Sequence, residues 1–253
     1  MLPAERKARI IEYVRQHRIA TVAQLAKTFD VHEATIRRDL IEIEQEGLLK
    51  RTHGGVMAEQ WTHDEAPFNE RSTTNLDQKM AIGKLAADLV EDGEHIIIDS
   101  GTTTLHIARN LVHRSNITVV TNDINVAAEL RDAPKIRVIV TGGELYPSSY
   151  MLNGMFTNQI LSTLHVSKAF IGIPAIHPKH GLMHPEAQLV PAKQGMIQAA
   201  SEIIVVADAS KIGKKSLHTV APIEAVHTLV TSSAVKEEDI KPFKDAGVTV
   251  YQA

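Results

Sequence analysis

Short, continuous apolar runs separated by helical stretches dominate the chain from Leu76 onward, and this alternation constrains the fold more than any other feature. An apolar run without alternating polar residues predicts a strand that is covered on both faces, which is typical of a parallel sheet between layers of helices. We therefore expect residues 76–253 to form one α/β domain with a mostly parallel sheet. The predicted strands are residues 95–98, 117–120, 136–140, 169–173, 203–207, 228–230 and 248–251.

The first 57 residues follow a different pattern, in which apolar residues recur at helical spacing over three short stretches. The spacing predicts a helix over residues 3–16, and Ile36, Leu40 and Ile43 predict another over residues 33–46. Between them, Thr21 and Gln24 form a capping box that predicts the start of a short helix.

A basic segment, residues 48–56, follows the third predicted helix and contains two glycines. Such a segment predicts a tight hairpin. Three helices followed by a basic hairpin indicate a winged helix-turn-helix domain over residues 1–57. Residues 58–75 are polar and have no sustained period, so we expect a linker there, with Trp61 and Phe68 suggesting that part of it packs down.

Composition excludes several classes of protein. The 253 residues are 43% hydrophobic and 23% charged, which is ordinary for a globular protein. The absence of cysteine excludes disulfides, thiolate zinc sites and cysteine nucleophiles, and it suits a reducing cytoplasm. Charges interrupt the apolar residues at the N-terminus, so we expect no signal peptide, and no apolar run is long enough for a membrane span.

Charge is divided unevenly between the two predicted domains. Residues 1–57 carry ten Lys/Arg against eight Asp/Glu, a net charge of +2, whereas residues 58–253 carry a net charge of −5. This division permits a small nucleic-acid-binding domain on an acidic body, although +2 is modest.

Candidate DNA contacts lie near the start of the third predicted helix and in the hairpin. The first turns of a recognition helix enter the major groove, where Arg37 and Arg38 can reach guanine edges or phosphates and Thr35 can contact either. Two arginines on a helix can also be a solvated face that pairs with neighbouring carboxylates, but their position after a turn and a capped helix favours DNA. The hairpin would place Lys50, Arg51 and His53 beside the DNA backbone.

A polar loop with a glycine directly follows the first predicted strand and opens a helix. Its residues are Asp99, Ser100, Gly101, Thr102, Thr103 and Thr104. Free backbone N–H groups and the positive end of the helix dipole suit a phosphate here. The alternative is that Asp99 and the threonines only cap the helix, and the local sequence does not decide between the two.

Two further polar loops follow the next two strands. They contain Thr121, Asn122 and Asp123, and then Gly142, Gly143 and Glu144. Loops that follow parallel strands leave the same edge of the sheet, where α/β folds bind ligands, so the group favours an anion site. Lys211, after the strand ending at Ala207, and Lys193, on a helix predicted over residues 187–200, are candidate cations for it.

Other motifs carry less. His177, His180 and His184 resemble metal ligands, but Pro178 and Pro185 break any helix that would align them, so we expect no metal. No GxGxxG, P-loop, nucleophile elbow or HExxH motif is present, and no cofactor is expected.

Taken in order, these motifs resemble the successive signatures of DeoR-family bacterial transcriptional regulators. The resemblance rests on residues 5–6 with 10–11, and on residues 34–40, 47–55, 99–104, 121–122, 141–144, 169–172 and 208–211, and it covers nearly the whole chain. It departs from the family pattern where His32 replaces a usual serine N-cap, Asp30 a frequent glycine and Ser167 a frequent aspartate.

The resemblance implies a winged helix-turn-helix joined to a sensor domain that resembles ribose-5-phosphate isomerase. It further implies a repressor of carbohydrate genes that a phosphorylated sugar releases from DNA. Thr35, Arg37 and Arg38 would then read DNA, and the three loops with Lys193 and Lys211 would hold the effector. We expect a homo-oligomer, a dimer or tetramer, because two-fold operators match paired DNA-binding domains.

Two alternatives stay open from the sequence. One is a phosphosugar isomerase with a DNA-binding appendage, since Asp99, Asp123 and Glu144 offer carboxylates that could act as a base. The other is a regulator that has lost control by a ligand.

Contacts of Lys50 and Arg51 with DNA phosphates predict a steep salt dependence of DNA binding. Replacing either residue with alanine should reduce the slope of log affinity against log salt concentration by about 0.9, because one fewer counterion is released. Affinity titrations at several salt concentrations measure this slope. A flat response for the unaltered protein would contradict the placement of these residues beside DNA.

Overall fold

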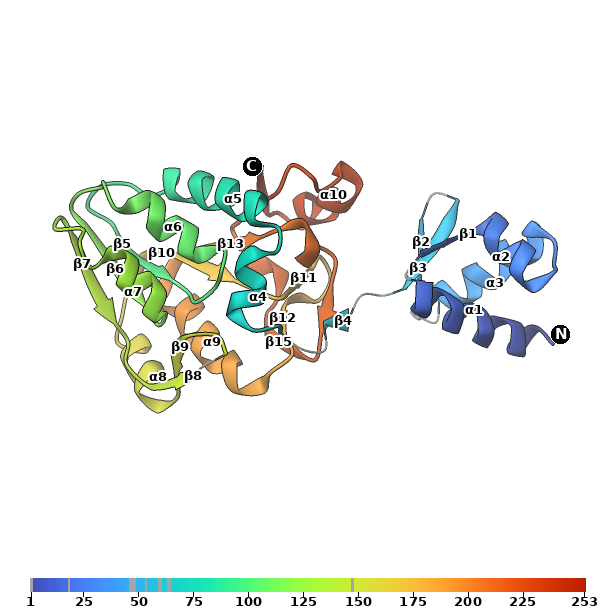
Figure 1. The fold of residues 1–253 in the computed structure, drawn as a ribbon, viewed down its shortest axis with the longest axis horizontal. Coiled ribbons are helices and arrows are strands. Elements are labelled where there is room, and N and C mark those ends of the chain that lie inside the picture. The colour runs from blue at the N-terminus through green and yellow to red at the C-terminus, as the bar shows by residue number, and fades with distance from the viewer. Residues whose placement is uncertain are drawn as a thin grey trace. The chain divides into compact units, whose positions relative to one another are not determined.

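A computed structural model describes residues 2–17, 19–45, 49–52, 54–58, 61–62, 65–146 and 148–253 of the chain. The chain divides into two compact units, Met1–Gln60 and Trp61–Ala253 (Figure 1). The first unit has its own buried apolar core, and the second has two cores, one on each face of a central sheet.

The first unit contains the three predicted helices and the predicted hairpin. The helices are α1 (Pro3–His17), α2 (Val22–Phe29) and α3 (Glu33–Gln45), and the hairpin is β2 (Leu49–Thr52) with β3 (Gly55–Ala58). A third strand, β1 (Ile19–Thr21), pairs antiparallel with β3. The sequence did not predict β1, because three residues are too short to show a period. The shared core buries Ile10, Val14, Leu25, Ile36, Leu40 and Ile43.

Local polar contacts define the turn between α2 and α3. The predicted capping box is confirmed: Gln24 N donates to Thr21 Oγ1 at 3.1 Å, and Thr21 N donates to Gln24 Oε1 at 2.8 Å. Asp30 ends α2 in the left-handed conformation with φ of 51°, which aspartate tolerates better than most residues. His32 substitutes for a serine cap, since its Nδ1 accepts from Ala34 N at 3.2 Å.

The second unit is built on a seven-stranded parallel sheet, as the apolar runs predicted. Across the sheet the order is β17-β16-β13-β10-β5-β6-β7, and every adjacent pair is parallel. The chain enters at the centre, moves outward on one side and then returns to the other side of β5, so the order reverses between β5 and β10. The strands are β5 (His95–Ile98), β6 (Ile117–Thr121), β7 (Ile136–Val140), β10 (Val166–Gly172), β13 (Ala200–Ala207), β16 (Thr228–Thr231) and β17 (Thr249–Gln252).

Helices cover both faces of this sheet (Figure 1). One face packs against α4 (Phe68–Thr73), α5 (Leu76–Asp88), α6 (Thr104–Leu111) and α7 (Ile124–Leu130). The opposite face packs against α8 (Met155–Leu161), α9 (Val190–Ala199) and α10 (Glu237–Asp245). The helix predicted over residues 187–200 is a single 3-10 turn, Ala187–Leu189, followed by α9, because Pro191 suits the first turn of a helix but not its interior.

Short strands lie outside the main sheet. They are β8 (Glu144–Tyr146) with β9 (Met151–Asn153), the antiparallel set β11 (Ala175–His177), β12 (Gly181–His184) and β15 (His218–Ala221), and β4 (Trp61–Thr62) with β14 (Lys215–Ser216). The segment expected to be a polar linker therefore contains β4 and α4, and Phe68 is buried.

Among the described residues, no helix has both the length and the apolar character that crossing a bilayer requires. His177 and His184 lie on β11 and β12, and no three His, Asp or Glu side chains among the described residues gather as a metal site.

A close approach between α5 and α6 depends on Gly83. A Cβ at this position would lie 2.3 Å from the Cβ of His106, and the two helices would have to move apart. Gly83→Ala should therefore lower the free energy of unfolding of the second unit by about 1–3 kcal/mol. Urea denaturation measures the change. The control is Lys84→Ala, an exposed residue on the same helix, and an equal loss in both variants would contradict the close packing.

Candidate functional site

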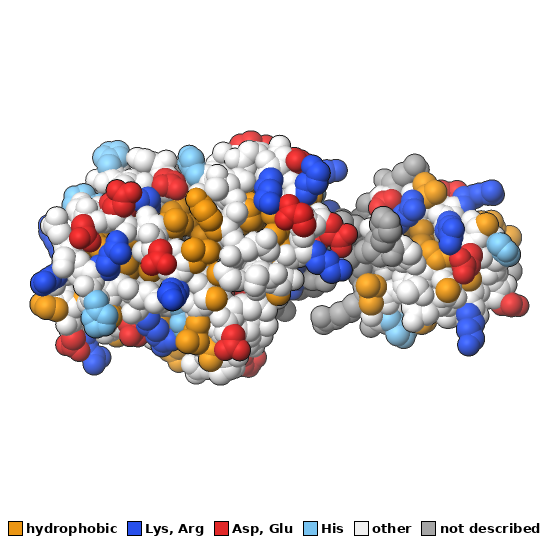
Figure 2. All heavy atoms as spheres, turned by 90° about the horizontal axis from the view of Figure 1, so that it is seen from above, with side chains coloured by type: hydrophobic (Ala, Val, Ile, Leu, Met, Phe, Trp, Pro, Cys, Tyr) orange, Lys and Arg blue, Asp and Glu red, His pale blue; other side chains and the backbone are white. Residues whose placement is uncertain are grey.

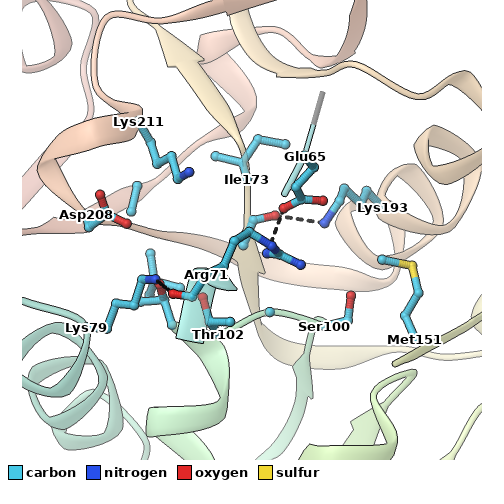
Figure 3. Close-up of a pocket in the computed structure, with 15 residues that line it drawn as sticks. Glu65, Arg71, Lys79, Ser100, Thr102, Met151, Ile173, Lys193, Asp208 and Lys211 are labelled. Atoms are coloured by element: carbon cyan, nitrogen blue, oxygen red, sulfur yellow. Dashed lines mark hydrogen bonds and ion pairs between the residues drawn. The ribbon is translucent and has the colours of Figure 1, made fainter. Parts of the chain in front are cut away.

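A pocket opens at the carboxyl ends of β5, β10 and β13, where the strand order reverses (Figure 3). This is the position at which open α/β sheets bind ligands. Of the residues predicted for an effector site, the pocket brings together Ser100, Gly101, Thr102, Thr103, Lys193 and Lys211. It is also lined by Glu65, Arg71, Lys79, Met151, Gly172, Ile173, Val206, Ala207 and Asp208.

Asp99 lies directly behind the pocket wall and joins three elements. Its Oδ2 lies 2.5 Å from Lys193 Nζ and accepts from Gly172 N at 3.1 Å, and its Oδ1 accepts from Ser100 N at 2.8 Å. Lys193 Nζ also donates to Gly172 O at 2.8 Å. The carboxylate is 1% exposed, so these contacts compensate its burial and hold Lys193 at the pocket. Asp99 does not cap α6, and the capping interpretation of this loop is wrong for that residue.

Lys79 places a poorly compensated positive charge at the other end of the pocket. It is only 3% exposed, and its Nζ donates to the backbone oxygen of Arg71. Among the described residues, no carboxylate lies within ion-pair distance of it. Burial lowers the pKa of Lys79; Asp208 opposes this shift, and Lys211 and Arg71 add to it.

Backbone donors of the loop before α6 lie beside this charge. The amide of Gly101 donates to Asp123 Oδ2 at 3.2 Å, but the amides of Thr102 and Thr103 have no acceptor among the described residues. Figure 3 shows Lys79, Lys211 and Thr102 on one side of the pocket and Lys193 and Ser100 on the other. Two lysines, two free amides and hydroxyl groups form a site that can hold a phosphate group.

The remaining predicted effector residues do not line the pocket. Thr104 Oγ1 donates to Gly101 O at 2.9 Å, and Asn122 Oδ1 accepts from Ser100 N at 3.1 Å, so both support the loop. Thr121 is buried at the end of β6, and its Oγ1 accepts from Asp123 N at 3.1 Å. Asp123 lies behind the pocket wall in the same way.

The loop after β7, which the sequence predicts to be part of the effector site, does not line this pocket. A Cβ on Gly143 would lie 2.5 Å from Asn153 O and from Thr157 Oγ1, so this loop packs against α8, and Gly142 O accepts from Thr157 Oγ1 at 2.6 Å. Glu144 is exposed on β8. The reason is the strand order, because β7 is the edge strand and lies two strands from β5.

Sequence reasoning missed Glu65, Arg71 and Lys79. Glu65 and Arg71 belong to the segment expected to be a linker, where the large apolar side chains of Trp61 and Phe68 indicate only that part of it packs down. Lys79 lies on α5, and no sequence pattern distinguishes it from a solvated lysine. Asp208 belongs to the motif of residues 208–211 with Lys211, but no sequence pattern marks it as part of the site.

Glu65 is held by two basic side chains. Arg71 Nη1 lies 2.7 Å from its Oε1, and His184 Nε2 lies 3.6 Å from its Oε2. Burial opposes ionisation, but His184, Arg71 and Lys193 together lower the pKa of Glu65 to about 2. Glu65 is therefore a carboxylate at neutral pH.

Of the predicted DNA contacts, Thr35, Arg37 and Arg38 lie on α3, and Lys50 and Arg51 lie on β2 of the first unit. Arg37 and Arg38 are exposed, Thr35 is half-buried, and Arg37 pairs with Glu33 at 2.9 Å. A hollow lined in part by Arg37 and Arg51 joins the start of α3 to the hairpin. The side chain of Lys50 and all of His53 lie outside the described residues.

Carboxylates near Arg38 have other partners. Asp39 pairs with Arg6 at 2.6 Å, Glu42 with Lys7 at 2.9 Å and Glu44 with Arg51 at 3.9 Å. Because these carboxylates are paired elsewhere, the described part of α3 leaves Arg38 accessible to an external anion such as a DNA phosphate.

In the view of Figure 2, acidic and basic side chains are interspersed over the second unit.

Profiles of known protein families match both units of the chain. A profile of the DeoR C-terminal sensor domain matches residues 74–233, and a profile of the DeoR-like helix-turn-helix domain matches residues 6–61. The chain belongs to the DeoR family of transcriptional regulators. The predicted family is confirmed, and so is the predicted fold class, a helix-turn-helix unit joined to a larger α/β unit with a parallel sheet.

Relatives of this DeoR-family chain match it over nearly its full length. YulB, an uncharacterised regulator of Bacillus subtilis, is 35% identical over 250 residues, covering 99% of this chain and 96% of that protein. GlcR, a transcriptional repressor of the same organism, is 34% identical over 233 residues, covering 91% and 89%. A putative repressor of the aga operon in Escherichia coli O157:H7 is 30% identical over 249 residues, covering 98% and 93%.

Solved structures similar to this DeoR-family regulator include two kinds of protein. The sorbitol operon regulator SorC of Klebsiella pneumoniae has a TM-score of 0.41 at 15% identity and covers 94% of this chain and 97% of that chain. Ribose 5-phosphate isomerase A of Methanocaldococcus jannaschii has a TM-score of 0.41 at 20% identity and covers 55% of each chain.

Asp123 should make the stability of this regulator depend on pH. Burial, with a smaller contribution from Asp99, raises the pKa of Asp123 from 3.8 to about 6, although three backbone amides oppose the shift. The folded state therefore binds more protons than the unfolded state between about pH 4 and 6. The free energy of unfolding should fall by about 3 kcal/mol as the pH rises through this window.

Urea denaturation at pH 4 and pH 7 tests this dependence. In Asp123→Asn the decrease should be smaller, because the group that titrates has been removed. An identical decrease in wild type and variant would show that Asp123 titrates normally in the folded state.

Proposed function

We propose that this regulator is a repressor that a phosphorylated sugar releases from its operator. The observation that carries the proposal is the buried ammonium group of Lys79, which lines a pocket and has no carboxylate partner among the described residues. A buried charge is costly unless an opposite charge compensates it, so the site favours an anion. Lys211 and the free amides of Thr102 and Thr103 can bind the oxygens of a phosphate group, so the anion favoured by the site is a phosphate.

The opposite end of the pocket suits the sugar. Ser100 and Lys193 present a hydroxyl and an ammonium group there, and Met151 adds an apolar surface (Figure 3). Such a mixture can bind the hydroxyl groups and the carbon face of a small sugar. The names of GlcR and of the aga operon repressor support a repressor, and the second associates its protein with a particular operon.

Sensing is better supported than isomerisation. A catalytic base must reach a substrate proton, but Asp99 already accepts three hydrogen bonds or ion-pair contacts and is 1% exposed. Asp123 and Glu144, the other candidate bases, do not line the pocket.

We assign DNA binding to residues 1–57 and sensing to residues 76–253, with Glu65 and Arg71 from the intervening segment completing the pocket. Thr35, Arg37 and Arg38 would read the major groove, and Lys50, Arg51 and His53 would contact the backbone. A homo-oligomer would present two recognition helices to a two-fold operator. The effector would shift the population toward an arrangement that no longer matches the operator, in proportion to its preference for that arrangement.

Fluorescence anisotropy tests the function directly. Labelled DNA from beside the gene, with a scrambled control, is titrated with protein, and the complex is then titrated with pentose and hexose phosphates and their unphosphorylated parents. Release by one phosphate ester and not by its parent sugar is expected. Specific binding that the whole panel leaves intact would contradict the sugar-phosphate effector, and product formation from an ester would favour the isomerase.

Lys79→Met should weaken release by the effector while specific DNA binding persists, because methionine fills the same space without the charge that attracts phosphate. The effector concentration needed for half-release should rise at least tenfold, which corresponds to about 1.4 kcal/mol. Lys84→Met, on the exposed side of the same helix, is the matched control. Equal effector sensitivity in the two variants would show that Lys79 does not contribute to effector binding.

A further inference from the structure

Among the described residues of the predicted linker, residues 58–75, Glu65 is the one carboxylate that lines the pocket. It follows β4, which pairs with β14 of the second unit, and precedes α4 by only a few residues. Glu65 thus lies five residues after Gln60, the last residue of the helix-turn-helix unit.

Arg71 holds this segment at two points. Its Nη1 pairs with Glu65 Oε1 at 2.7 Å, and its Nε donates to Ala66 O at 2.7 Å. Figure 3 shows the Arg71 side chain reaching across the pocket, with its guanidinium beside Glu65. Arg71 thus faces both the segment and the space that a ligand would occupy.

His184 provides the second contact of Glu65. Its Nδ1 accepts from Glu186 N at 3.1 Å, and its Nε2 lies 3.6 Å from Glu65 Oε2. The side chain of Glu65 is 15% exposed. Arg71 contacts one of its carboxylate oxygens, and His184 contacts the other.

The charge of Glu65 opposes the charge of a phosphate. Among the described residues, the pocket is lined by the cations Arg71, Lys79, Lys193 and Lys211 and by the carboxylates Glu65 and Asp208. Lys193 is already paired with Asp99, and Asp208 accepts from Asn75 Nδ2 at 3.1 Å, whereas Glu65 pairs with Arg71. A phosphate ester that enters would be attracted to Arg71 and repelled by Glu65, because like charges in a poorly solvated site destabilise each other. The bound phosphate and the Glu65–Arg71 pair are therefore mutually unfavourable.

We propose that Glu65 couples the pocket to the DNA-binding unit by acting as an internal anion that competes with the effector. Before the effector binds, Glu65 occupies Arg71 and keeps residues 65–66 against the pocket wall. Phosphate takes over Arg71, repels Glu65 and releases this segment. This inference rests on the proposed function, since it assumes that the effector is an anion bound in this pocket.

Reciprocity gives the coupling its expected sign. Displacing Glu65 consumes part of the binding free energy of the effector. Removing the charge of Glu65 should therefore strengthen effector binding. The same change should uncouple residues 65–66 from the ligand. The effector's affinities for the protein with these residues against the pocket wall and with them released would then differ less.

The first experiment compares the full-length wild type with Glu65→Gln and with Glu129→Gln. Glu129 also pairs with an arginine, Arg109 at 3.3 Å, but it lies on α7 outside the pocket. Binding of inorganic phosphate and of the sugar phosphate panel is measured by calorimetry. Glu65→Gln should bind the releasing ester about tenfold more tightly than wild type, as expected when one like charge leaves a partly buried site. Glu129→Gln should match wild type.

The second experiment uses unaltered protein, so it does not depend on how a variant folds. Phe68 N donates to Ser148 O at 2.7 Å and reports on attachment of the segment. Hydrogen exchange of this amide should become faster when the ester or inorganic phosphate binds. Unchanged or slower exchange would overturn the displacement of the segment.

The outcomes separate this inference from the proposed function. Weaker or unchanged ester binding by Glu65→Gln, with normal release of wild type from DNA by the ester, overturns the role of Glu65 and leaves the sugar-phosphate repressor standing. A wild type that binds no ester of the panel overturns both. Tighter binding by Glu65→Gln together with faster exchange at Phe68 in wild type supports the coupling.

Discussion

The pocket depends on the buried contact between Asp99 and Lys193. This pair joins the end of β5, the end of β10 and helix α9, which are brought together only where the strand order reverses. Each charge is almost completely buried, so neither would be stable there without the other. The pair therefore closes one wall of the pocket and leaves the cations of the opposite wall for another partner.

On the opposite wall of the pocket, Lys79 carries a buried positive charge that no carboxylate among the described residues compensates. Lys79 is as deeply buried as Lys193 but has only a backbone oxygen as a close contact among the described residues. A protein that retains such a charge gives up stability that a bound anion restores, and ligand binding then stabilises the folded sensor. Asp99 thus holds Lys193 in place, whereas Lys79, which has no carboxylate partner among the described residues, is available to a bound anion.

Much of the fold was predictable because its determinants are local. The capping box at Thr21 and Gln24, the apolar stripe of α3 and the continuous apolar runs of the sheet are each set by neighbours in the chain. The loops after β5, β6 and β7 were also recognisable from their glycines and polar residues. Strand β1 was not, because its pairing with β3 is a tertiary contact between short segments.

The candidate site was predictable only in part, and the division has a clear physical cause. The sequence by itself determined which elements form and that polar loops leave one edge of the sheet, since period and turn residues act over a few positions. Only the tertiary structure decided that the loop of Gly142 and Gly143 lies beyond the pocket, while Glu65, Arg71 and Lys79 line it. Strand order and burial decide which charges meet, and both depend on residues far apart in the chain.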